Sequence, residues 1–255
     1  MTDRRLILVT NDDGYGAAGL EALIKAMGDL GEVFVVAPDR ERSGVSHAIT
    51  LNHPLRVKAC GPSRFTCDGT PTDCVFLGVH NLMPRAPDLV VSGINHGPNL
   101  ADDVTYSGTV AGAMEGTIMG IPSVAVSLSA RAGADFQPAA DFAARIATFV
   151  LERGLPARTL LNVNVPDTAG APVTGFRWTR GGLRDYGHTV ITQQDPRGRP
   201  MYWIGSDIRH HSIEGSDCDA MAAGVAAVTP IYLDMTHTSY LRELCDVAIP
   251  GLTLR

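Results

Sequence analysis

Two adjacent aspartates, Asp12 and Asp13, follow a short apolar run, Leu6–Thr10. The run is rich in Leu, Ile and Val, which is typical of a strand buried in a parallel sheet. Ligands of open α/β sheets bind beyond the carboxyl ends of the strands, so both carboxylates stand where a ligand would bind. Two close carboxylates repel each other and need a cation or a shared proton between them. A polar turn that caps the next helix explains one such aspartate more readily than two, so the pair favours a cation site.

Three further loops at predicted strand ends carry polar groups that could join the pair. Ser43 lies in a polar loop, Asn95 lies in a loop of Asn and Gly residues, and Ser107-Gly108-Thr109 precedes a helix of small residues. Two carboxylates, a hydroxyl and an amide carbonyl suit a hard cation such as Mg²⁺ or Mn²⁺. Free N–H groups at a helix start suit an anion. Together they are suited to the hydrolysis of a phosphate ester, although each loop alone is typical of an ordinary turn.

The segment Gly14-Tyr15-Gly16-Ala17-Ala18-Gly19 matches the glycine pattern of dinucleotide-binding proteins, and an acidic residue, Asp39, follows the next predicted strand. In that fold a pyrophosphate approaches the glycine turn and the helix start. Here Asp12 and Asp13 stand immediately beside the turn and would repel it unless a cation intervened. A nicotinamide-dependent enzyme that uses Gly14, Gly16 and Gly19 therefore stays the weaker alternative.

The composition of the chain limits its class. Its 255 residues are 45% hydrophobic and 19% charged, which is ordinary for a globular protein of one large domain. The net charge of -6 offers no basic surface, so we expect no nucleic-acid polymer as a partner. The N-terminal apolar run is too short for a membrane span or a signal segment. The five scattered cysteines include no CxxC pair, so we expect reduced thiols and a cytoplasmic location.

Segments with strand and helix periodicity alternate along residues 1–166 and predict a doubly wound, mostly parallel, Rossmann-like α/β sheet that binds metal and phosphate. Strands are predicted at 6–10, 33–37, 88–93, 123–128 and 160–165, with short ones at 49–51 and 55–57. Helices are predicted at about 20–30, 70–82, 110–120 and 142–150, the second of them capped by Thr70.

The pattern changes in residues 167–255, which we predict to be a hairpin projection and a C-terminal segment of the same domain. Two strands near 189–192 and 201–204 are joined by the turn Asp195-Pro196-Arg197-Gly198. A short helix near 219–221, a strand over 225–233 and a final helix near 239–247 follow. Exposure of Tyr202, Trp203, Ile231 and Tyr232 would be costly, so these residues indicate an oligomer interface.

The ordered motifs of this chain strongly resemble those of the SurE family of stationary-phase survival proteins. The resemblance covers nearly the whole chain and rests on Asn11-Asp12-Asp13-Gly14, Ala37-Pro38-Asp39-Arg40, Arg42-Ser43-Gly44, Gly69-Thr70-Pro71-Thr72-Asp73-Cys74-Val75, Ser92-Gly93-Ile94-Asn95-His96-Gly97-Pro98-Asn99-Leu100, Tyr106-Ser107-Gly108-Thr109-Val110-Ala111, Asp195-Pro196-Arg197-Gly198, Ser216-Asp217-Cys218-Asp219 and Val228-Thr229-Pro230.

The resemblance implies a cytoplasmic, metal-dependent 5'-nucleotidase that acts on nucleoside 5'-monophosphates, and in some members on short polyphosphate. It implies homodimers or homotetramers with exchanged C-terminal segments. The metal ligands carry over onto Asp12, Asp13, Ser43 and Asn95, and both aspartates are the candidates for catalysis. The phosphate-contacting residues carry over onto Asn99, Ser107, Gly108 and Thr109. Among the histidines, His188 in the hairpin region is the one whose role we would test.

Three other activities remain as alternatives to a metal-activated water. A phosphatase could form an aspartyl-phosphate on one of the two aspartates, which trapping of a phospho-enzyme would detect. A nicotinamide enzyme would bind its dinucleotide without metal. A non-catalytic nucleotide sensor would bind nucleotide and metal and show no turnover.

Overall fold

The structure, a computed structural model, describes residues 4–130, 133–185, 190–204 and 209–253. Nine strands form its central sheet: β1 (Leu6–Thr10), β2 (Glu32–Pro38), β3 (Val57–Gly61), β4 (Arg64–Cys67), β5 (Leu89–His96), β6 (Ser123–Ser129), β7 (Thr159–Pro166), β8 (Phe176–Trp178) and β13 (Ala226–Tyr232). Their order across the sheet is β3-β4-β2-β1-β5-β6-β7-β13-β8.

The six strands from β4 to β7 run parallel. At the edges, β3 is antiparallel to β4, β13 is antiparallel to β7, and β8 is parallel to β13. From β1 the chain goes to β2 on one side and then to β5 on the other, so the strand order reverses between β1 and β5. This is the doubly wound arrangement that the alternating pattern predicts, and ligands of such sheets bind at the point of reversal.

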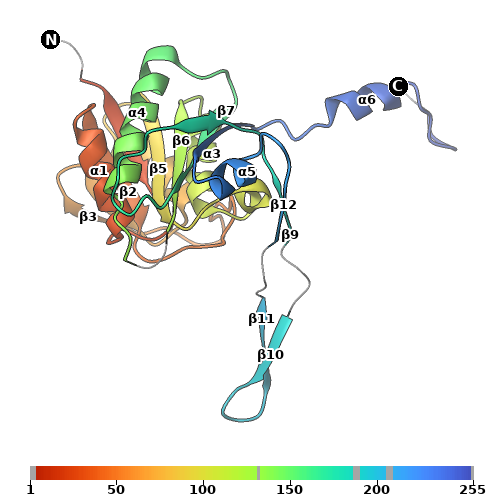
Figure 1. The fold of residues 1–255 in the computed structure, drawn as a ribbon, viewed down its shortest axis with the longest axis horizontal. Coiled ribbons are helices and arrows are strands. Elements are labelled where there is room, and N and C mark those ends of the chain that lie inside the picture. Colours follow the sequence, from red (N-terminus) through yellow and green to blue (C-terminus); the bar gives the residue numbers. More distant parts are fainter. Residues whose placement is uncertain (1–3, 131–132, 186–189, 205–208, 254–255) are drawn as a thin grey trace.

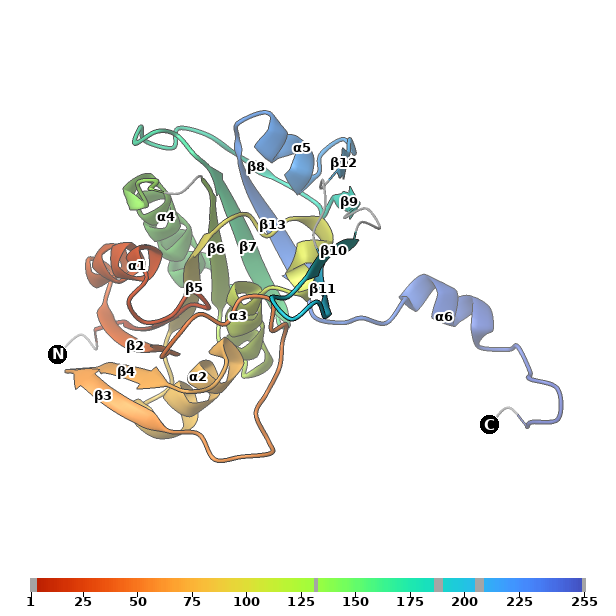
Figure 2. The same cartoon turned by 90° about the horizontal axis from the view of Figure 1, so that it is seen from below.

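Helices cover both faces of the sheet (Figures 1 and 2). The helices α1 (Ala18–Gly28) and α4 (Gln137–Arg153) pack on one face, and α2 (Pro71–Leu77) and α3 (Gly108–Ile118) pack on the other. Successive side chains of a strand point to opposite faces. Accordingly Ile7 and Val9 join the core under α1 and α4, whereas Leu6 and Leu8 join the core under α2. This burial on both faces explains the unbroken apolar run of β1.

The start of α2 follows the predicted capping pattern, whereas the segment before it does not form the predicted strands. Thr70 accepts the N–H of Asp73, and the Asp73 carboxylate accepts the N–H of Thr70. The helix becomes π-helical over Gly78–Leu82. The strands predicted at 49–51 and 55–57 are wrong, because residues 49–56 form a loop and the hairpin β3–β4 follows it. The side chains of β3 are all exposed. Its sequence therefore lacks the alternation of apolar and polar residues from which a half-buried strand is predicted.

Beyond residue 166 the chain contributes β8 and β13 to the same sheet, and α5 (Asp217–Ala222) lies beside them. The predicted hairpin is present: β10 (Val190–Gln194) pairs with β11 (Pro200–Ile204), and at its base β9 (Leu183–Asp185) pairs with β12 (Arg209–His211). It projects away from the body, as does the C-terminal arm with α6 (Thr238–Leu244) (Figure 1). His188 lies outside the described residues.

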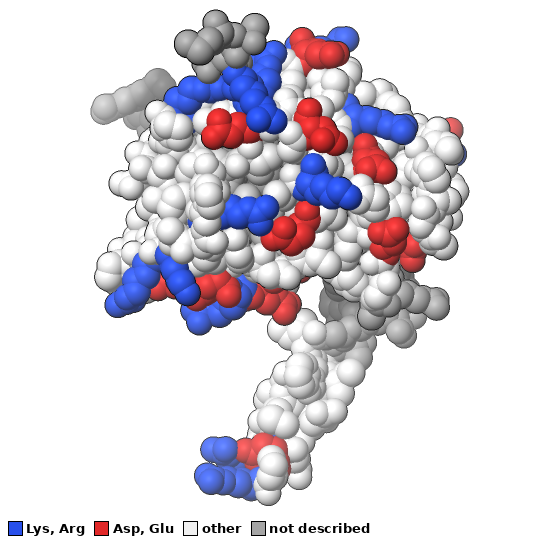
Figure 3. All heavy atoms as spheres, turned by 90° about the vertical axis from the view of Figure 1, so that its left-hand side faces the viewer, with Lys and Arg blue, Asp and Glu red and all other residues white. Residues whose placement is uncertain are grey.

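Charges of both signs alternate over the face shown in Figure 3, and acidic and basic side chains lie together at the tip of the projection. This face therefore lacks an extended basic surface of the kind that binds nucleic acid. Among the described residues, none of the helices combines the length and the hydropathy of a membrane span.

Candidate active site

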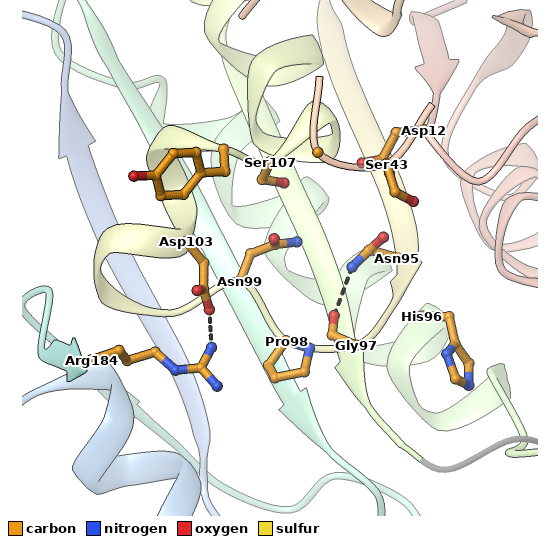
Figure 4. A pocket seen from close by; sticks show the side chains of 12 residues that line it. Asp12, Ser43, Asn95, His96, Gly97, Pro98, Asn99, Asp103, Ser107 and Arg184 are labelled. Atoms are coloured by element: carbon orange, nitrogen blue, oxygen red, sulfur yellow. Dashed lines mark hydrogen bonds and ion pairs between the residues drawn. The ribbon is translucent and has the colours of Figure 1, made fainter. Parts of the chain in front are cut away.

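A cavity of about 390 Å³ opens at the carboxyl edge of the sheet, beside the ends of β1 and β5 (Figure 4). It brings together five of the eight predicted site residues, and the other three lie behind its wall or beside it. The lining consists of Asp12, Ser43, Gly44, Asn95, His96, Gly97, Pro98, Asn99, Asp103, Tyr106, Ser107 and Arg184. His96 is exposed and also lines this cavity.

Asp12 is the most deeply buried of the acidic residues predicted for the site, with 3% of its surface exposed. Burial raises the pKa of its carboxyl from 3.8 to about 6, and the charge of Asp13 adds to this rise. The hydroxyl and the backbone N–H of Thr109 donate to the carboxylate and oppose the rise. Because burial and the charge of Asp13 disfavour the ionised form of this carboxyl, a nearby positive charge would stabilise it.

Asp13 connects the ends of β1 and β5. Its Oδ2 accepts the backbone N–H of His96 at 3.1 Å. Burial raises the pKa of this carboxyl, the His96 hydrogen bond lowers it, and the charge of Glu41 raises it. Neither Asp12 nor Asp13 forms a salt bridge with a Lys or Arg of the described residues.

Ser43 and Asn95 bring a hydroxyl and an amide to the same side of the cavity as Asp12 (Figure 4). The loop of Ser43 is attached to the Asp12 backbone, since the N–H of Arg42 donates to the Asp12 carbonyl oxygen at 2.7 Å. The Nδ2 of Asn95 donates to the Gly97 carbonyl oxygen at 2.8 Å, which turns Oδ1 toward Ser43 and Asp12. The Ser43 hydroxyl donates to Glu41 at 2.9 Å.

The start of α3 contacts Asp12 directly. Thr109 is fully buried and directs its hydroxyl to Asp12. Ser107 caps the helix, and its Oγ accepts the Val110 N–H at 3.1 Å. The N–H of Ser107 donates to the Asp103 carbonyl oxygen. Within the described chain, the N–H of Gly108 is left as the first-turn donor without a hydrogen bond.

Position 108 requires glycine, because Asp12 occupies the space that a side chain would need. A Cβ at this position would lie 2.8 Å from the Cβ and 2.9 Å from the Oδ2 of Asp12. Such distances are shorter than real van der Waals contacts, so the carboxylate would have to move. The glycine therefore permits the close approach of α3 to β1.

Asn99 is held by a buried polar network that reaches across β6 and β7. Its backbone N–H donates to Asn164 Oδ1 at 2.8 Å, and its Nδ2 donates to Ser127 Oγ at 2.8 Å. The side-chain amides of Asn162 and Asn164 donate to its carbonyl oxygen at 2.9 and 3.0 Å. Two Asn residues at alternate positions of a buried strand are the signal in the sequence that could have indicated this support.

The opposite wall of the cavity carries an ion pair that the sequence did not indicate. Arg184 of β9 pairs with Asp103, and both side chains are largely buried (Figure 4). Asp217 supports the pair, because its carboxylate accepts the N–H groups of Ala101 at 2.9 Å and Gly182 at 2.8 Å. Arg184 lies in a stretch without periodicity, so no local signal marks it.

The acidic cavity fits a hard cation. Among the described residues no group of three or more His, Cys, Asp or Glu side chains could hold a metal ion. The hydroxyl of Ser43 and the amide oxygen of Asn95 would therefore have to complete a set begun by Asp12 and Asp13. Oxygen donors of this kind suit Mg²⁺ or Mn²⁺. A bound cation would offset the repulsion between the two carboxylates and their loss of hydration on burial.

Two glycines of the dinucleotide-like pattern, Gly14 and Gly19, have structural roles. A Cβ on Gly19 would lie 2.0 Å from the Ile94 carbonyl oxygen, so this glycine lets α1 pack on β5. Gly14 has a φ of 97°, and Asn11 Nδ2 donates to its carbonyl oxygen at 3.0 Å. These constraints explain Gly14 and Gly19 without a bound dinucleotide, whereas nothing lies within 4 Å of a Cβ placed on Gly16.

The fold and the cavity define a doubly wound α/β protein with an acidic, oxygen-rich site at the reversal of its strand order. The model of the family "Survival protein SurE" matches residues 7–188, and the chain belongs to this family.

Relatives from two bacteria extend the similarity over almost the whole chain. A protein of Geotalea daltonii, named 5'-nucleotidase SurE, is 55% identical over 240 residues, which are 93% of this chain and 97% of that protein. The protein of the same name from Geobacter sulfurreducens is 54% identical over 93% of this chain and 92% of its own length. The crystal structure of the SurE protein from Aquifex aeolicus is 44% identical, has a TM-score of 0.83, and covers 94% of this chain and 98% of its own.

Proposed function

We propose that this chain is a divalent-cation-dependent 5'-nucleotidase that hydrolyses the phosphomonoester of nucleoside 5'-monophosphates. The observation that carries the proposal is a pair of carboxylates with raised pKa values at the strand-order reversal: Asp12 lines the cavity together with Asn95, and Asp13 accepts the N–H of His96. The name 5'-nucleotidase SurE of relatives that are more than half identical supports the same activity. Short polyphosphate, whose terminal phosphate would bind at the same place, belongs to the same proposal.

Asp12, Asp13, Ser43 and Asn95 would hold the cation, and Mg²⁺ or Mn²⁺ is our choice because all donors are hard oxygens. A bound divalent cation supplies a Lewis acid that offsets negative charge on the phosphate. The protein prepares this site by holding Asp12 through Thr109 and Asp13 through His96.

The phosphate group would lie between the two aspartates and the start of α3. There the N–H of Gly108 and the hydroxyl of Ser107 are the donors, and the N-terminus of a helix favours negative charge. Asn99 lines the same cavity with its backbone fixed by β7. These groups orient the ester for attack by water, and a carboxyl oxygen of Asp12 or Asp13 accepts the proton that the water loses.

The nucleoside would extend toward the cavity rim, where Tyr106 is 62% exposed. An exposed phenol ring can stack on any nucleobase because every base offers a π face. Tyr106 therefore favours a substrate with a base over a small phosphate ester without one.

The test is hydrolysis of a panel of phosphate esters with Mg²⁺, with Mn²⁺ and with chelator. We expect release of phosphate from nucleoside 5'-monophosphates only when a cation is present. Binding without turnover would indicate a nucleotide sensor, and a trapped phospho-enzyme would indicate a covalent mechanism on Asp12 or Asp13. Dinucleotide binding in the presence of chelator would favour the nicotinamide alternative. Each of these outcomes contradicts the proposal.

We also propose that the protein is a homodimer or homotetramer in the cytoplasm, joined through its arm and projection. The arm exposes 96% of Met235 and 67% of Leu252, and the projection exposes 97% of Ile204 and 59% of Trp203. Apolar side chains on extended segments gain stability when a second copy covers them. The five cysteines are free thiols, which suits a reducing compartment.

A further inference from the structure

A second cavity of about 390 Å³ lies behind the loop that carries Ser43, and its lining is basic and polar. Three arginines from two separate segments face it, together with one histidine and one carboxylate. The lining residues are Arg40, Arg42, Thr50, His53, Pro54, Arg56, Asp68, Gly69 and Thr70. We call this cavity the arginine pocket.

The positive charge of the arginine pocket is only partly neutralised. Arg56 approaches Asp68 at 3.6 Å, and Arg40 approaches Asp39 at 3.6 Å. The backbone N–H of Arg56 donates to Asp68 at 2.8 Å and, with the Arg56 charge, lowers the pKa of that carboxyl. One ionised carboxylate in the lining therefore faces three guanidinium groups.

Arg42 is the least satisfied of the three. Its guanidinium donates to the Asp68 carbonyl oxygen, and it forms no salt bridge within the described part of the chain. Its Nε is buried and has no hydrogen-bond partner among the described residues. A buried donor without a partner lowers stability, and a bound acceptor would recover that loss.

The arginine pocket is also rigidly attached to the candidate active site. The N–H of Arg42 donates to the Asp12 carbonyl oxygen at 2.7 Å, so the backbone of Arg42 is fixed next to Asp12. The following residues, Ser43 and Gly44, line the other cavity. One short loop thus forms part of both cavities.

We propose that the arginine pocket is a second anion site, which binds a phosphate group independently of the cation at Asp12 and Asp13. Guanidinium groups bind phosphate oxygens in pairs of hydrogen bonds, which makes arginine the preferred residue for this anion. Among the described residues that line the pocket there is no Phe, Tyr or Trp, so the large aromatic side chains on which bases stack are missing and a small phosphate compound fits better than a nucleic acid. The phosphate is either free orthophosphate or one group of a ligand with several phosphates.

The experiment is a calorimetric titration of the full chain with orthophosphate and with tripolyphosphate, in chelator and at low ionic strength. The variant is Arg40→Gln/Arg56→Gln, whose side chains are exposed, and the matched control is Arg145→Gln in a different, apolar cavity. We expect the variant to bind at least about tenfold more weakly, with a shallower salt dependence, and the control to bind as the unmodified chain does.

Affinity for both anions would identify a single phosphate as the ligand, and affinity for tripolyphosphate alone would identify a ligand with several phosphates. Equal binding by the unmodified chain and the double variant, or binding of neither anion, would overturn the proposal. The titration involves no hydrolysis, so its result is independent of whether the chain hydrolyses nucleotides. Melting temperatures of all three proteins verify that they are folded.

Discussion

The hydroxyl of Thr109 donates a hydrogen bond to the carboxylate of Asp12, although the two residues are 97 positions apart in the sequence. The backbone N–H of Thr109 donates to the same carboxylate. The first turn of α3 therefore positions an acidic side chain before it can contact any ligand. Partners that orient a metal ligand in this way tune both the geometry and the affinity of the site.

Replacement of Thr109 by Ala should lower Mn²⁺ affinity and kcat/KM by about 10- to 100-fold, because Asp12 loses its orienting hydroxyl. Thr109→Ser retains the hydroxyl and should restore most of both quantities. Isothermal titration with Mn²⁺ and steady-state kinetics on the same samples measure this. Unchanged Mn²⁺ affinity in Thr109→Ala, with only a lower melting temperature, would assign Thr109 a purely structural role.

Replacement of Asp12 or Asp13 by Asn should remove most activity, by about 100-fold or more, while the protein stays folded. The reason is that the site loses charge and no apolar core. Ser43→Ala is the comparison, and its loss should be smaller because water can replace a hydroxyl ligand. Circular dichroism verifies folding, and phosphate release measures activity. Full activity of either Asn variant would exclude the cation mechanism.

Replacement of Gly108 by Ala should already be severe, because the new Cβ would lie 2.8 Å from the Asp12 Cβ. Displacement of the carboxylate by about 1 Å is enough to cost about 100-fold in kcat/KM. The clash is with the protein itself, so it does not depend on the size of the substrate. Gly16→Ala is the control, since nothing lies within 4 Å of a Cβ there. Equal kinetics of the two variants would contradict the close packing of α3 on Asp12.

The raised pKa of Asp12 predicts how stability of the cation-free protein depends on pH. The folded-state pKa is about 6 and the reference value is 3.8, so between these values the folded chain binds the proton more tightly than the unfolded chain. Stability in chelator should therefore rise as pH falls from 7 toward 4, by roughly 2–3 kcal/mol from this group.

Asp12→Asn lacks this group, so the difference in unfolding free energy between the two proteins isolates its contribution. Urea unfolding at pH 5, 6 and 7 in chelator measures it. With saturating Mg²⁺ the trend should weaken or reverse, because the cation competes with the proton for the carboxylate. A difference that does not vary with pH would contradict the raised pKa.

Removal of residues 238–255 should convert the proposed oligomer into smaller species, because the arm extends from the body with its apolar side chains exposed (Figure 2). Light scattering at micromolar concentration measures the mass of the intact and the shortened chain. Leu241→Glu, in α6, is a milder variant with the same expected direction. A monomeric mass for the intact chain would refute the proposed assembly.

The class of fold and the position of the site follow from local patterns in the sequence. The apolar run of β1 is buried on both faces of the sheet. Such burial requires a layer of helices on each face, and the segments with helical periodicity predict these helices. Asp12 and Asp13 follow β1, and Asn95 lies near the end of β5; they meet because parallel neighbours end at the same edge of a sheet. Such features depend on spacing alone, so the printed sequence is sufficient to predict them.

Tertiary structure alone decided which distant partner each polar group around the cavity has. Thr109 turns to Asp12, and Asn99 is held by Asn164, 65 positions away. Arg184 reaches the cavity from an aperiodic segment, 81 positions from its partner Asp103. A hydroxyl, amide or guanidinium can serve many acceptors, and only the packing of distant segments selects one of them. The local pattern of the sequence specifies the helix, strand or loop on which a side chain lies, and long-range packing specifies which residue that side chain contacts.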